Sequence, residues 1–405
     1  MVLTEATPSK VCDVTCAPSQ VTVSSSRAVV SDVLIVGAGL AGSIAALVFA
    51  RRGARVTVVD PHAQPRDNFR CDKLSPSQLA LIEELGLSDC IEGLGTKLKK
   101  LQVVRNGISM MHELTEVACR YDVLIKAFRD RWPANVTFVQ DLALDIKESA
   151  DGPSVHLQSG RILTARLAIL TTGHDQRLQR NIGLERNLLR TNQSLIFGFQ
   201  MDAAARPKAC ESLIYCGQKA GDGIAYVNIF AFEDRTQVDL FTHKVPSDPW
   251  IHAFRRDPLP ALHAVMPGLK KYMGNGSVLS PVRMAATHLW DNSAPNLAGV
   301  VLLGDAQLAS CPVLGLGVTR ILTGIRQLAQ QHWPNWQGRA PLTRAQIEDY
   351  YSDPIIQHLA ENSIYASKFV HSLSTRTGAY WRLRRLWPSV KDVGRQAVKR
   401  IRHQG

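Results

Sequence analysis

The sequence predicts an α/β fold made of a parallel-sheet domain, an inserted antiparallel β-sheet and a helical C-terminal segment. Three observations support this class. A strand, a glycine-rich turn, a helix and a second strand follow one another over residues 33–60. Strand-like alternation dominates residues 191–290. A second glycine-rich loop, residues 304–317, separates another apolar strand from a helix.

The composition is that of a globular protein with a basic tail. The chain has 405 residues, enough for two or three domains, of which 45% are apolar and 20% are charged. The net charge is +12, and the tail, residues 381–405, holds eight Lys or Arg and one Asp. Because the remaining chain is nearly balanced, we expect no nucleic acid as a partner.

The eight cysteines are scattered, with no paired C-x-x-C units and no Cys/His spacing typical of zinc. We therefore predict no metal site, reduced thiols and a cytoplasmic protein. Residues 1–30 are rich in Ser, Thr, Val and Pro and lack the apolar core of a signal peptide, so we expect a disordered leader.

Residues 33–50 carry no charge and are long enough to span a bilayer. Three glycines at their centre and the apolar strand that follows favour a different structure. We predict a buried strand at Val33–Val36, a helix at Ala41–Arg52 that ends at Gly53, and a second strand at Val56–Val59.

The glycines of this turn follow the spacing G-x-G-x-x-G. Gly37 permits the tight turn, Gly39 lets the backbone approach a pyrophosphate at the helix N-terminus, and Gly42 lets helix and strand pack closely. Asp60 ends the second strand, where a carboxylate can accept hydrogen bonds from a ribose hydroxyl. The pattern predicts a Rossmann-type site for a dinucleotide.

The chain downstream favours FAD over NAD. A simple NAD domain would continue as alternating strands and helices. Here a loop, a helix and a β-rich stretch precede a returning strand that ends in Thr171-Thr172-Gly173. That arrangement is typical of flavoproteins.

The second loop carries a specific resemblance. It reads Gly304-Asp305-Ala306-Gln307-Leu308, followed by Pro312, Gly315 and Gly317. It resembles the second FAD motif, G-D-A-A-H-x-x-x-P-x-x-G-x-G, of the para-hydroxybenzoate hydroxylase-type (group A) FAD-dependent monooxygenases, with Leu in place of His. The resemblance covers residues 31–330. It implies a Rossmann-type FAD-binding domain with an inserted antiparallel β-sheet substrate domain, and it assigns Gly304 to the cofactor site.

The resemblance also implies roles for the other residues of this loop. Asp305 accepts hydrogen bonds from the ribityl chain of FAD. Gly315, Leu316 and Gly317 bring backbone N–H groups close to the flavin ring. Pro312 shapes the face on which the reaction takes place.

Two arginines and one histidine are further candidates. Arg70 matches a family arginine that contacts the pyrophosphate. Arg120 lies where the family often has an arginine near the cofactor, and a solvated cation at a helix start is an equal alternative. His288 ends the strand before the second motif, in a region that lines the substrate pocket in the family. It is either a catalytic candidate or a structural histidine.

The third motif of the family is poorly matched. D-G-x-x-S-x-x-R is expected after the returning strand, and the chain reads TTGHDQRLQR, with Gly173 in place and Arg180 one position late. Since that motif helps to bind the nicotinamide donor, we expect NAD(P)H to reduce the flavin either directly or through a partner reductase.

The strands of residues 191–290 are rich in aromatic side chains. They carry Phe197, Phe199, Tyr226, Phe230 and Phe232. In the family this sheet covers the substrate above the flavin, which implies a lipophilic or aromatic substrate. Plain hydrophobic core is the alternative reading of these residues.

The basic tail combines an apolar stripe of Val390, Val393, Ala397 and Ile401 with basic residues on another helical face. This composition fits an interfacial amphipathic helix on an anionic membrane, and equally a solvated helix that caps the FAD domain. The first alternative predicts a protein peripheral to the inner face of the membrane.

We therefore expect a leader at 1–30, an FAD-binding domain at 31–190 (with a β excursion near 97–118) and 291–340, a substrate domain at 191–290, and a helical region with the basic tail at 341–405. The resemblance implies a monooxygenase that uses molecular oxygen to hydroxylate or epoxidise a lipophilic or aromatic small molecule through a C4a-peroxyflavin, in a biosynthetic pathway. The alternatives are a reductase of the geranylgeranyl-reductase type, a flavin-dependent halogenase, which the absence of a W-x-W-x-I-P sequence disfavours, and a membrane-associated flavin protein without turnover.

Overall fold

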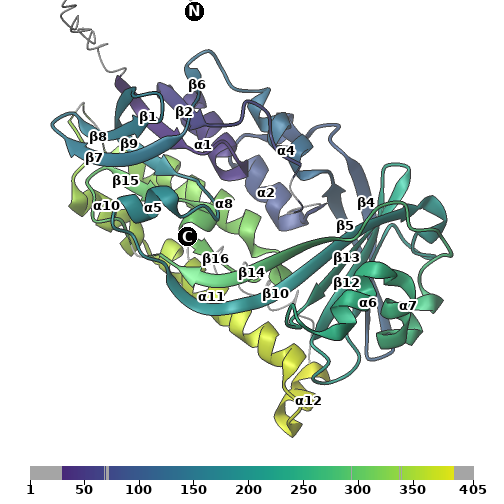
Figure 1. Ribbon diagram of the computed structural model, residues 1–405. Helices are drawn as coiled ribbons and strands as arrows, with labels where there is room; N and C mark the ends of the chain where they lie inside the picture. The colour runs from purple at the N-terminus through teal and green to yellow at the C-terminus, as the bar shows by residue number, and fades with distance from the viewer. Residues whose placement is uncertain are drawn as a thin grey trace, which may run out of the picture.

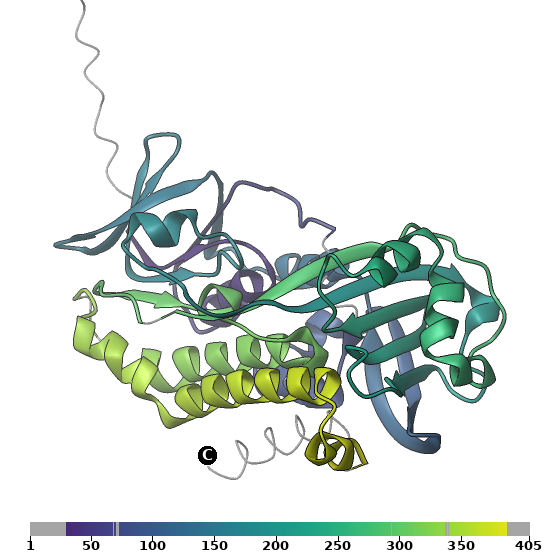
Figure 2. The same ribbon diagram turned by 60° about the horizontal axis from the view of Figure 1, so that its bottom comes forward.

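Two β-sheets and a layer of helices make up the protein (Figures 1 and 2). The computed structural model describes residues 30–386, except 68, 70–72, 293, 337 and 339. Arg70, the leader up to residue 29 and the tail from residue 387 onward lie outside the described residues.

The first sheet has seven strands in the order β6–β2–β1–β9–β8–β7, with β15 beside the end of β9. The strands β6, β2, β1, β9 and β15 run parallel, and β7 and β8 form an antiparallel edge. The bounds are β1 (Val30–Val36), β2 (Val56–Asp60), β6 (Val136–Gln140), β7 (Ala143–Ser149), β8 (Gly152–Leu157), β9 (Ile162–Leu170) and β15 (Val300–Leu302).

A hydrophobic core covers each face of this sheet. Successive side chains of a strand point to opposite sides, so alternate residues of one strand belong to different cores. Val33 and Ile35 of β1 pack into a core with the helix α1 (Leu40–Arg51), and Leu34 and Val36 pack into a second core on the other face. Every residue of α1 from Leu40 to Ala50 is buried. The charge-free run of residues 33–50 is therefore a strand, a glycine turn and a buried helix of an α/β core. No helix within the described part of the chain is long and apolar enough to cross a membrane.

The second sheet has nine strands in the order β16–β14–β10–β13–β12–β11–β4–β5–β3. All its neighbours pair antiparallel except β11 and β4, which are parallel. The bounds are β3 (Lys73–Leu74), β4 (Thr96–Arg105), β5 (Ile108–Ala118), β10 (Asn187–Asp202), β11 (Ser212–Cys216), β12 (Ile224–Phe232), β13 (Arg235–Thr242), β14 (Arg283–Asp291) and β16 (Leu308–Ala309).

The expected fold class is confirmed, and the second sheet is wider than the strand patterns of residues 191–290 alone indicate. The β excursion near 97–118 forms β4 and β5 of this sheet. Two short helices, α6 (Pro249–Arg256) and α7 (Pro258–Val265), pack on the sheet through a core that includes Phe254. The long strands β10 and β14 belong to this second sheet and extend from it to the region below the first sheet (Figures 1 and 2).

The remaining helices surround the first sheet and extend toward the second. Their bounds are α2 (Pro76–Glu84), α3 (Ser88–Ile91), α4 (Tyr121–Arg129), α5 (Arg177–Asn181), α8 (Leu316–Arg326), α9 (Trp333–Asn335), α10 (Arg344–Ser352), α11 (Pro354–Thr375) and α12 (Ala379–Leu386), and short helical turns include η3 (Gly304–Ala306) and η4 (Pro312–Leu314). The long helix α11 runs under α8 and the antiparallel strands (Figure 2). Its Ser367 accepts a hydrogen bond from the backbone N–H of Cys311 (3.0 Å) and so supports the second glycine-rich loop.

Candidate functional site

Three loops meet at the carboxyl edge of the first sheet, after β1, β9 and β15. The N–H of Thr171, after β9, donates to the carbonyl of Val36 at the end of β1 (2.8 Å). The N–H of Leu303, after β15, donates to the carbonyl of Leu170 (3.0 Å). Since β2 and β9 lie on opposite sides of β1, this edge is the switch point where α/β sheets bind their ligands.

The first glycine turn is built around a close contact between α1 and the loop before it. Gly37 has φ +102°, and its carbonyl accepts a hydrogen bond from Thr171 Oγ1 (2.6 Å). A Cβ at Gly42 would lie 1.8 Å from that same carbonyl oxygen, so only glycine fits there. A Cβ at Gly39, by contrast, would meet no atom within 4 Å.

The open space beside Gly39 fits a phosphate group. Gly39 is the N-cap of α1 and provides no side-chain cap for the first N–H groups of the helix. Those donors, together with the positive end of the helix dipole, favour an anion at this point. The residues present therefore fit the pyrophosphate of a dinucleotide.

Asp60 holds the glycine turn from the neighbouring strand. One carboxylate oxygen accepts a hydrogen bond from the backbone N–H of Ala38 (2.7 Å), and the other accepts one from the N–H of His62 (2.8 Å). Oδ1, which accepts from the N–H of His62, also lies 3.2 Å from Nδ1 of that histidine. Oδ2 has a second lone pair, from which Asp60 can accept a ribose hydroxyl while it keeps these contacts.

The arginine beside this turn is Arg129 rather than Arg120. Arg129 ends α4 and donates to the carbonyls of Ala38 and Ala63. Burial lowers the pKa of Arg129, and the nearby carboxylate of Asp60 opposes this shift. Arg120 precedes the same helix, is half exposed and pairs with Asp122 (2.6 Å). The two arginines lie at opposite ends of a nine-residue helix, which spans roughly 13 Å.

The second loop places Asp305 among cationic and aromatic side chains. One oxygen of Asp305 lies 3.2 Å from Arg320, and the other lies 3.2 Å from Nε2 of His174. Arg320 is buried and also donates to Ser310 (2.8 Å). Burial lowers the pKa of Arg320, and the neighbouring Asp305 opposes this shift. Arg320 and His174 therefore hold the Asp305 carboxylate from two sides.

His174 and Gln179 occupy the region of the poorly matched third motif. Gln179 is buried and donates to the carbonyl of Ala306 (3.0 Å), inside the second loop. Arg180, one position later, is exposed and contacts Gln176. An amide therefore contacts the loop where the family pattern has an arginine. Sequence reasoning missed His174 because no spacing rule connects it to Asp305.

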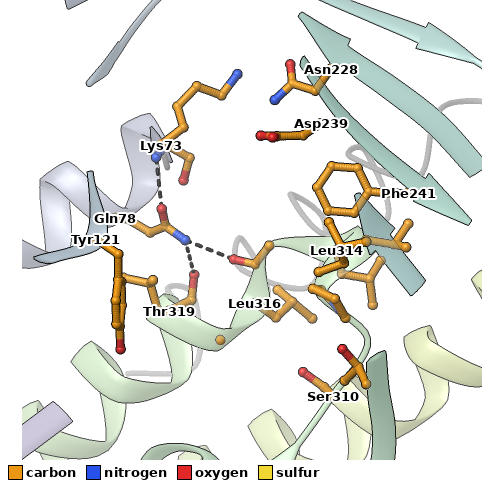
Figure 3. Close-up of a pocket in the computed structure, with 18 of the residues that line it drawn as sticks. Lys73, Gln78, Tyr121, Asn228, Asp239, Phe241, Ser310, Leu314, Leu316 and Thr319 are labelled. Atoms are coloured by element: carbon orange, nitrogen blue, oxygen red, sulfur yellow. Dashed lines mark hydrogen bonds between the residues drawn. The ribbon is translucent and has the colours of Figure 1, made fainter. Parts of the chain in front are cut away.

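The N-terminus of α8 forms the other part of this site. Gly315 has φ +64° and is the N-cap of α8, again without a side-chain cap. A Cβ at Gly315 or at Gly317 would meet no atom within 4 Å. The carbonyl of Gly315 accepts a hydrogen bond from Gln78 Nε2 (2.9 Å), which also lies 3.4 Å from Thr319 Oγ1 (Figure 3). Gln78 therefore fixes this loop against α2.

A cavity of about 610 Å³ lies between the second loop and the second sheet. One wall consists of Pro312–Thr319, at the start of α8. The opposite wall comes from the strands β10, β12, β13 and β14. Figure 3 shows Asn228 of β12 and Asp239 and Phe241 of β13 on this wall. Its apolar lining includes Leu40, Leu114, Ile196, Ile214, Phe241, Leu314 and Leu316. The hydroxyl of Tyr226 donates to the carbonyl of Val313 (2.9 Å) and joins the two walls.

The structure brings most of the predicted residues together. Asp305, Pro312, Gly315, Leu316 and Gly317 line the cavity. His288 does not line it, whereas its strand neighbours Ala285 and Thr287 do. Nδ1 of His288 accepts a hydrogen bond from the backbone N–H of Asn192 (3.0 Å), on the far side of β14. Among the described residues, no group of three or more His, Cys, Asp or Glu could hold a metal ion.

Comparisons with known proteins agree with this geometry. Residues 30–147 match the family model of an FAD binding domain. The chain is 24% identical over 367 residues to squalene monooxygenase of Mus musculus, covering 84% of this chain and 59% of that protein. It is 23% identical over 322 residues to ubiquinone hydroxylase UbiL of Rhodospirillum rubrum, covering 75% of this chain and 72% of that protein. The chain thus spans about three-fifths of the length of the squalene monooxygenase.

The fold is similar to that of p-nitrophenol 4-monooxygenase PnpA from Pseudomonas putida DLL-E4. The TM-score is 0.67 at 15% identity, over 92% of this chain and 96% of the other. At this identity the likeness shows the fold alone.

Substitution of two glycines in the first turn should separate folding from cofactor binding. Gly42→Ala places a Cβ 1.8 Å from the carbonyl of Gly37 and should lower the free energy of unfolding by about 1–3 kcal/mol. Gly39→Ala meets no atom of the protein, so the melting temperature of the FAD-free protein should stay close to that of the unaltered protein. The added methyl occupies the space of the pyrophosphate and should weaken FAD binding roughly tenfold, about 1.4 kcal/mol.

The two variants are matched controls, because each adds one methyl to the same turn. Thermal unfolding of the FAD-free proteins and FAD titration by fluorescence measure the two effects. A folded Gly39→Ala protein that binds FAD as tightly as the unaltered protein would contradict the assigned phosphate position.

Proposed function

We propose that the protein is an FAD-dependent monooxygenase that hydroxylates or epoxidises a lipophilic or aromatic small molecule. The match of residues 30–147 to the family model of an FAD binding domain and the similarity to squalene monooxygenase over 84% of the chain support this proposal. The names of its relatives, squalene monooxygenase and ubiquinone hydroxylase, are consistent with a lipophilic substrate. The observation that carries the proposal is the cavity of about 610 Å³ between the second glycine-rich loop and the second sheet.

The residues that would hold FAD extend from one helix N-terminus to the other. The pyrophosphate fits beside Gly39, and Asp60 is positioned for the ribose next to it. Asp305 is positioned for the ribityl hydroxyls, and the open backbone at Gly315 and Gly317 is positioned for the ring. When bound there, FAD supplies the redox and oxygen chemistry, and the protein supplies orientation and electrostatics.

The protein groups around the ring site favour negative charge and exclude water. The first N–H groups of α8 have no partner within the helix, so they stabilise an anion at this wall of the cavity. Pro312 and Leu314 belong to the turn just before this helix, and Phe241 of β13 lies near Leu314 (Figure 3). A substrate held against these side chains lies in an apolar space that the second sheet covers. We propose that this sheet serves as the substrate domain.

The electron donor we propose is NAD(P)H, used directly or through a reductase. The buried Gln179 occupies the position of the arginine expected in the third motif and donates to the loop, and the exposed Arg180 donates to Gln176. If this difference weakens binding of the dinucleotide donor, reduction by NAD(P)H alone should be slow.

Turnover measurements test the activity. With NADPH or NADH, a source of reductase and lipophilic or aromatic test substrates, oxygen uptake should equal formation of an oxygenated product, and label from ¹⁸O₂ should appear in it. Stopped-flow reduction of the flavin, with and without substrate, shows whether the donor acts directly. Substrate reduction without oxygen uptake would instead indicate a reductase, and a product that depends on halide would indicate a halogenase.

We propose in addition that the basic tail attaches the protein to an anionic membrane surface. Helix α12 packs on the rest of the protein, since Arg385 donates to the carbonyl of Leu373 in α11 (2.6 Å). The truncation that tests membrane attachment therefore begins after α12. Residues 387–405 hold five Lys or Arg and one Asp, and each basic residue near such a surface contributes about 1 kcal/mol.

Deletion of residues 387–405 should abolish sedimentation with anionic vesicles and leave FAD bound. The matched control keeps the chain length and replaces Lys391, Arg395, Lys399 and Arg402 by Gln. It should lose binding as well, and 0.5 M salt should weaken binding of the intact protein, because the screening length falls below about 10 Å. Equal binding of the intact protein to neutral vesicles would refute the electrostatic attachment, and loss of FAD on deletion would identify the tail as a structural cap.

A further inference from the structure

Exposed apolar side chains gather at one end of the molecule, on the β4–β5 hairpin and on the helices α11 and α12. The residues are Ile108 at the tip of the hairpin, Tyr365 of α11, and Tyr380 and Leu383 of α12, with exposed fractions of 66%, 66%, 55% and 65%. We call these four residues the apolar face. Large apolar side chains that are exposed together, rather than singly, indicate a surface that binds a partner.

The hairpin and α12 contact each other, so these side chains belong to one surface. The side-chain amide of Asn106, in the turn of the hairpin, donates to the backbone carbonyl of Arg385 (3.1 Å). The ring of Tyr365 stacks on Phe369 (6.3 Å between centroids), and Phe369 contacts Trp381 of α12 (5.9 Å). In Figure 2 the hairpin and α12 project on the same side of the molecule.

The charges around the apolar face are basic. Residues 105–112 contain one Arg, residues 362–386 contain five Lys or Arg, and neither segment contains Asp or Glu. Nε of Arg384 donates to the hydroxyl of Tyr380 (3.0 Å), so a cation lies beside an exposed ring. Asp222, in the loop before β12, partly balances Arg385. Apolar side chains among long basic ones suit an anionic bilayer, at whose headgroups tyrosine rings are enriched.

On the hairpin side, the apolar face continues into the wall of the cavity. In the β4–β5 pair, Met110 lies opposite Val103, and residues opposite each other share one face of a sheet. Val103 belongs to a small core against which Leu114 packs, and Leu114 lines the cavity. Positions 108, 110, 112 and 114 therefore follow one side of β5, with His112 as the polar member. Their side chains change from exposed at Ile108 and Met110 to half-buried at Leu114.

The helix side is connected to the cavity as well. Phe369 of α11 packs against the same buried core as Leu314 and Phe241, which line the cavity. The rings of Tyr380, Trp381 and Phe369 contact one another in that order, with 5.1 and 5.9 Å between centroids. A row of aromatic rings thus extends from the exposed surface of α12 to the wall of the cavity.

We propose that the apolar face docks the folded body on an anionic lipid surface. Helix α12 ends at residue 386 and the basic tail follows directly, so a bilayer that holds the tail lies beside this face. The tail supplies electrostatic attraction, and the apolar face inserts and sets the orientation. This assignment rests on the proposed function and makes it more specific: the lipophilic substrate comes from the lipid phase, on the side of the cavity at Leu114 and Leu314.

Co-sedimentation of the FAD-loaded full-length protein with vesicles of phosphatidylcholine and phosphatidylglycerol in equal parts tests the apolar face. The double variant Ile108→Ser/Leu383→Ser should bind about tenfold more weakly than the unaltered protein, because two apolar side chains no longer leave water on docking. The matched double variant Ile162→Ser/Leu144→Ser changes the same residue types, 45% and 42% exposed, on β9 and β7 away from α12 (Figure 1). It should bind as tightly as the unaltered protein.

Tyr365→Ser provides an independent variant on α11. It removes an exposed ring of the apolar face and should also weaken vesicle binding. All these variants alter exposed side chains, so their melting temperatures and FAD content should match those of the unaltered protein. If the double variant Ile108→Ser/Leu383→Ser does not fold, the comparison of Tyr365→Ser with the matched double variant is still decisive.

Unchanged or tighter vesicle binding by the apolar-face variants would overturn the proposal, because the tail would then attach the protein without this face. A dimer that becomes a monomer in the double variant Ile108→Ser/Leu383→Ser, measured by sedimentation velocity without vesicles, would also overturn it and identify a contact between two copies of the chain.

Because binding is measured, the outcome is separate from that of the proposed activity. A protein that docks through the apolar face but takes up no oxygen would retain the docking surface and lose the monooxygenase assignment. Oxygen-coupled turnover with unchanged vesicle binding by the variants would do the reverse.

Discussion

The contact between the carbonyl of Gly37, the hydroxyl of Thr171 and the bare Cα of Gly42 is the constraint on which the rest of this site depends. The hydrogen bond from Thr171 joins the ends of β1 and β9, and the missing side chain at Gly42 lets α1 begin directly against the turn. The first N–H groups of α1 consequently face open space at the carboxyl edge of the sheet. A side chain at position 42 would meet the carbonyl oxygen of Gly37, so α1 could not begin this close to the turn.

The same edge also positions the second half of the site. The strand β15 pairs with the last residues of β9, so the turn at Gly304 lies beside the start of α1. From there the chain passes through β16, which pairs with β14 of the second sheet, before it reaches η4 and α8. The loop that lines the cavity is therefore attached to both sheets. This double attachment fixes the position of one wall of the cavity, and Gln78 and Tyr226 add hydrogen bonds to backbone carbonyls of the loop.

Local sequence patterns predicted the parts of this molecule that depend on local conformation. The glycine spacing at 37–42 and the motif at 304–317 require particular backbone angles and close approaches, and both are visible within one short segment. The strands β10 to β14 alternate clearly enough to be recognised. The pairing of β4 with β11 is not encoded in either strand alone, because strand partners are chosen by tertiary packing.

The site residues that the sequence did not indicate make their contacts with residues that lie far away in the chain. Arg129 contacts the first glycine turn only because α4 packs beside α1, and the resemblance pointed to Arg120 at the other end of that helix. The cavity lining also combines Lys73, Glu116, Asn228 and Asp239, from four strands that no spacing rule connects. For His288 the sequence pointed to the pocket and the structure does not place it there. Side chains alternate along β14, so Thr287 lines the cavity and His288 contacts Asn192 instead.

The central claim is that this arrangement of two uncapped helix N-termini binds FAD. The most direct measurement is to purify the protein, record its absorption spectrum and identify the cofactor released by heat. The account predicts a yellow protein that releases FAD, in a ratio close to one per chain, and no FMN or NAD. A colourless protein that does not take up added FAD would contradict it.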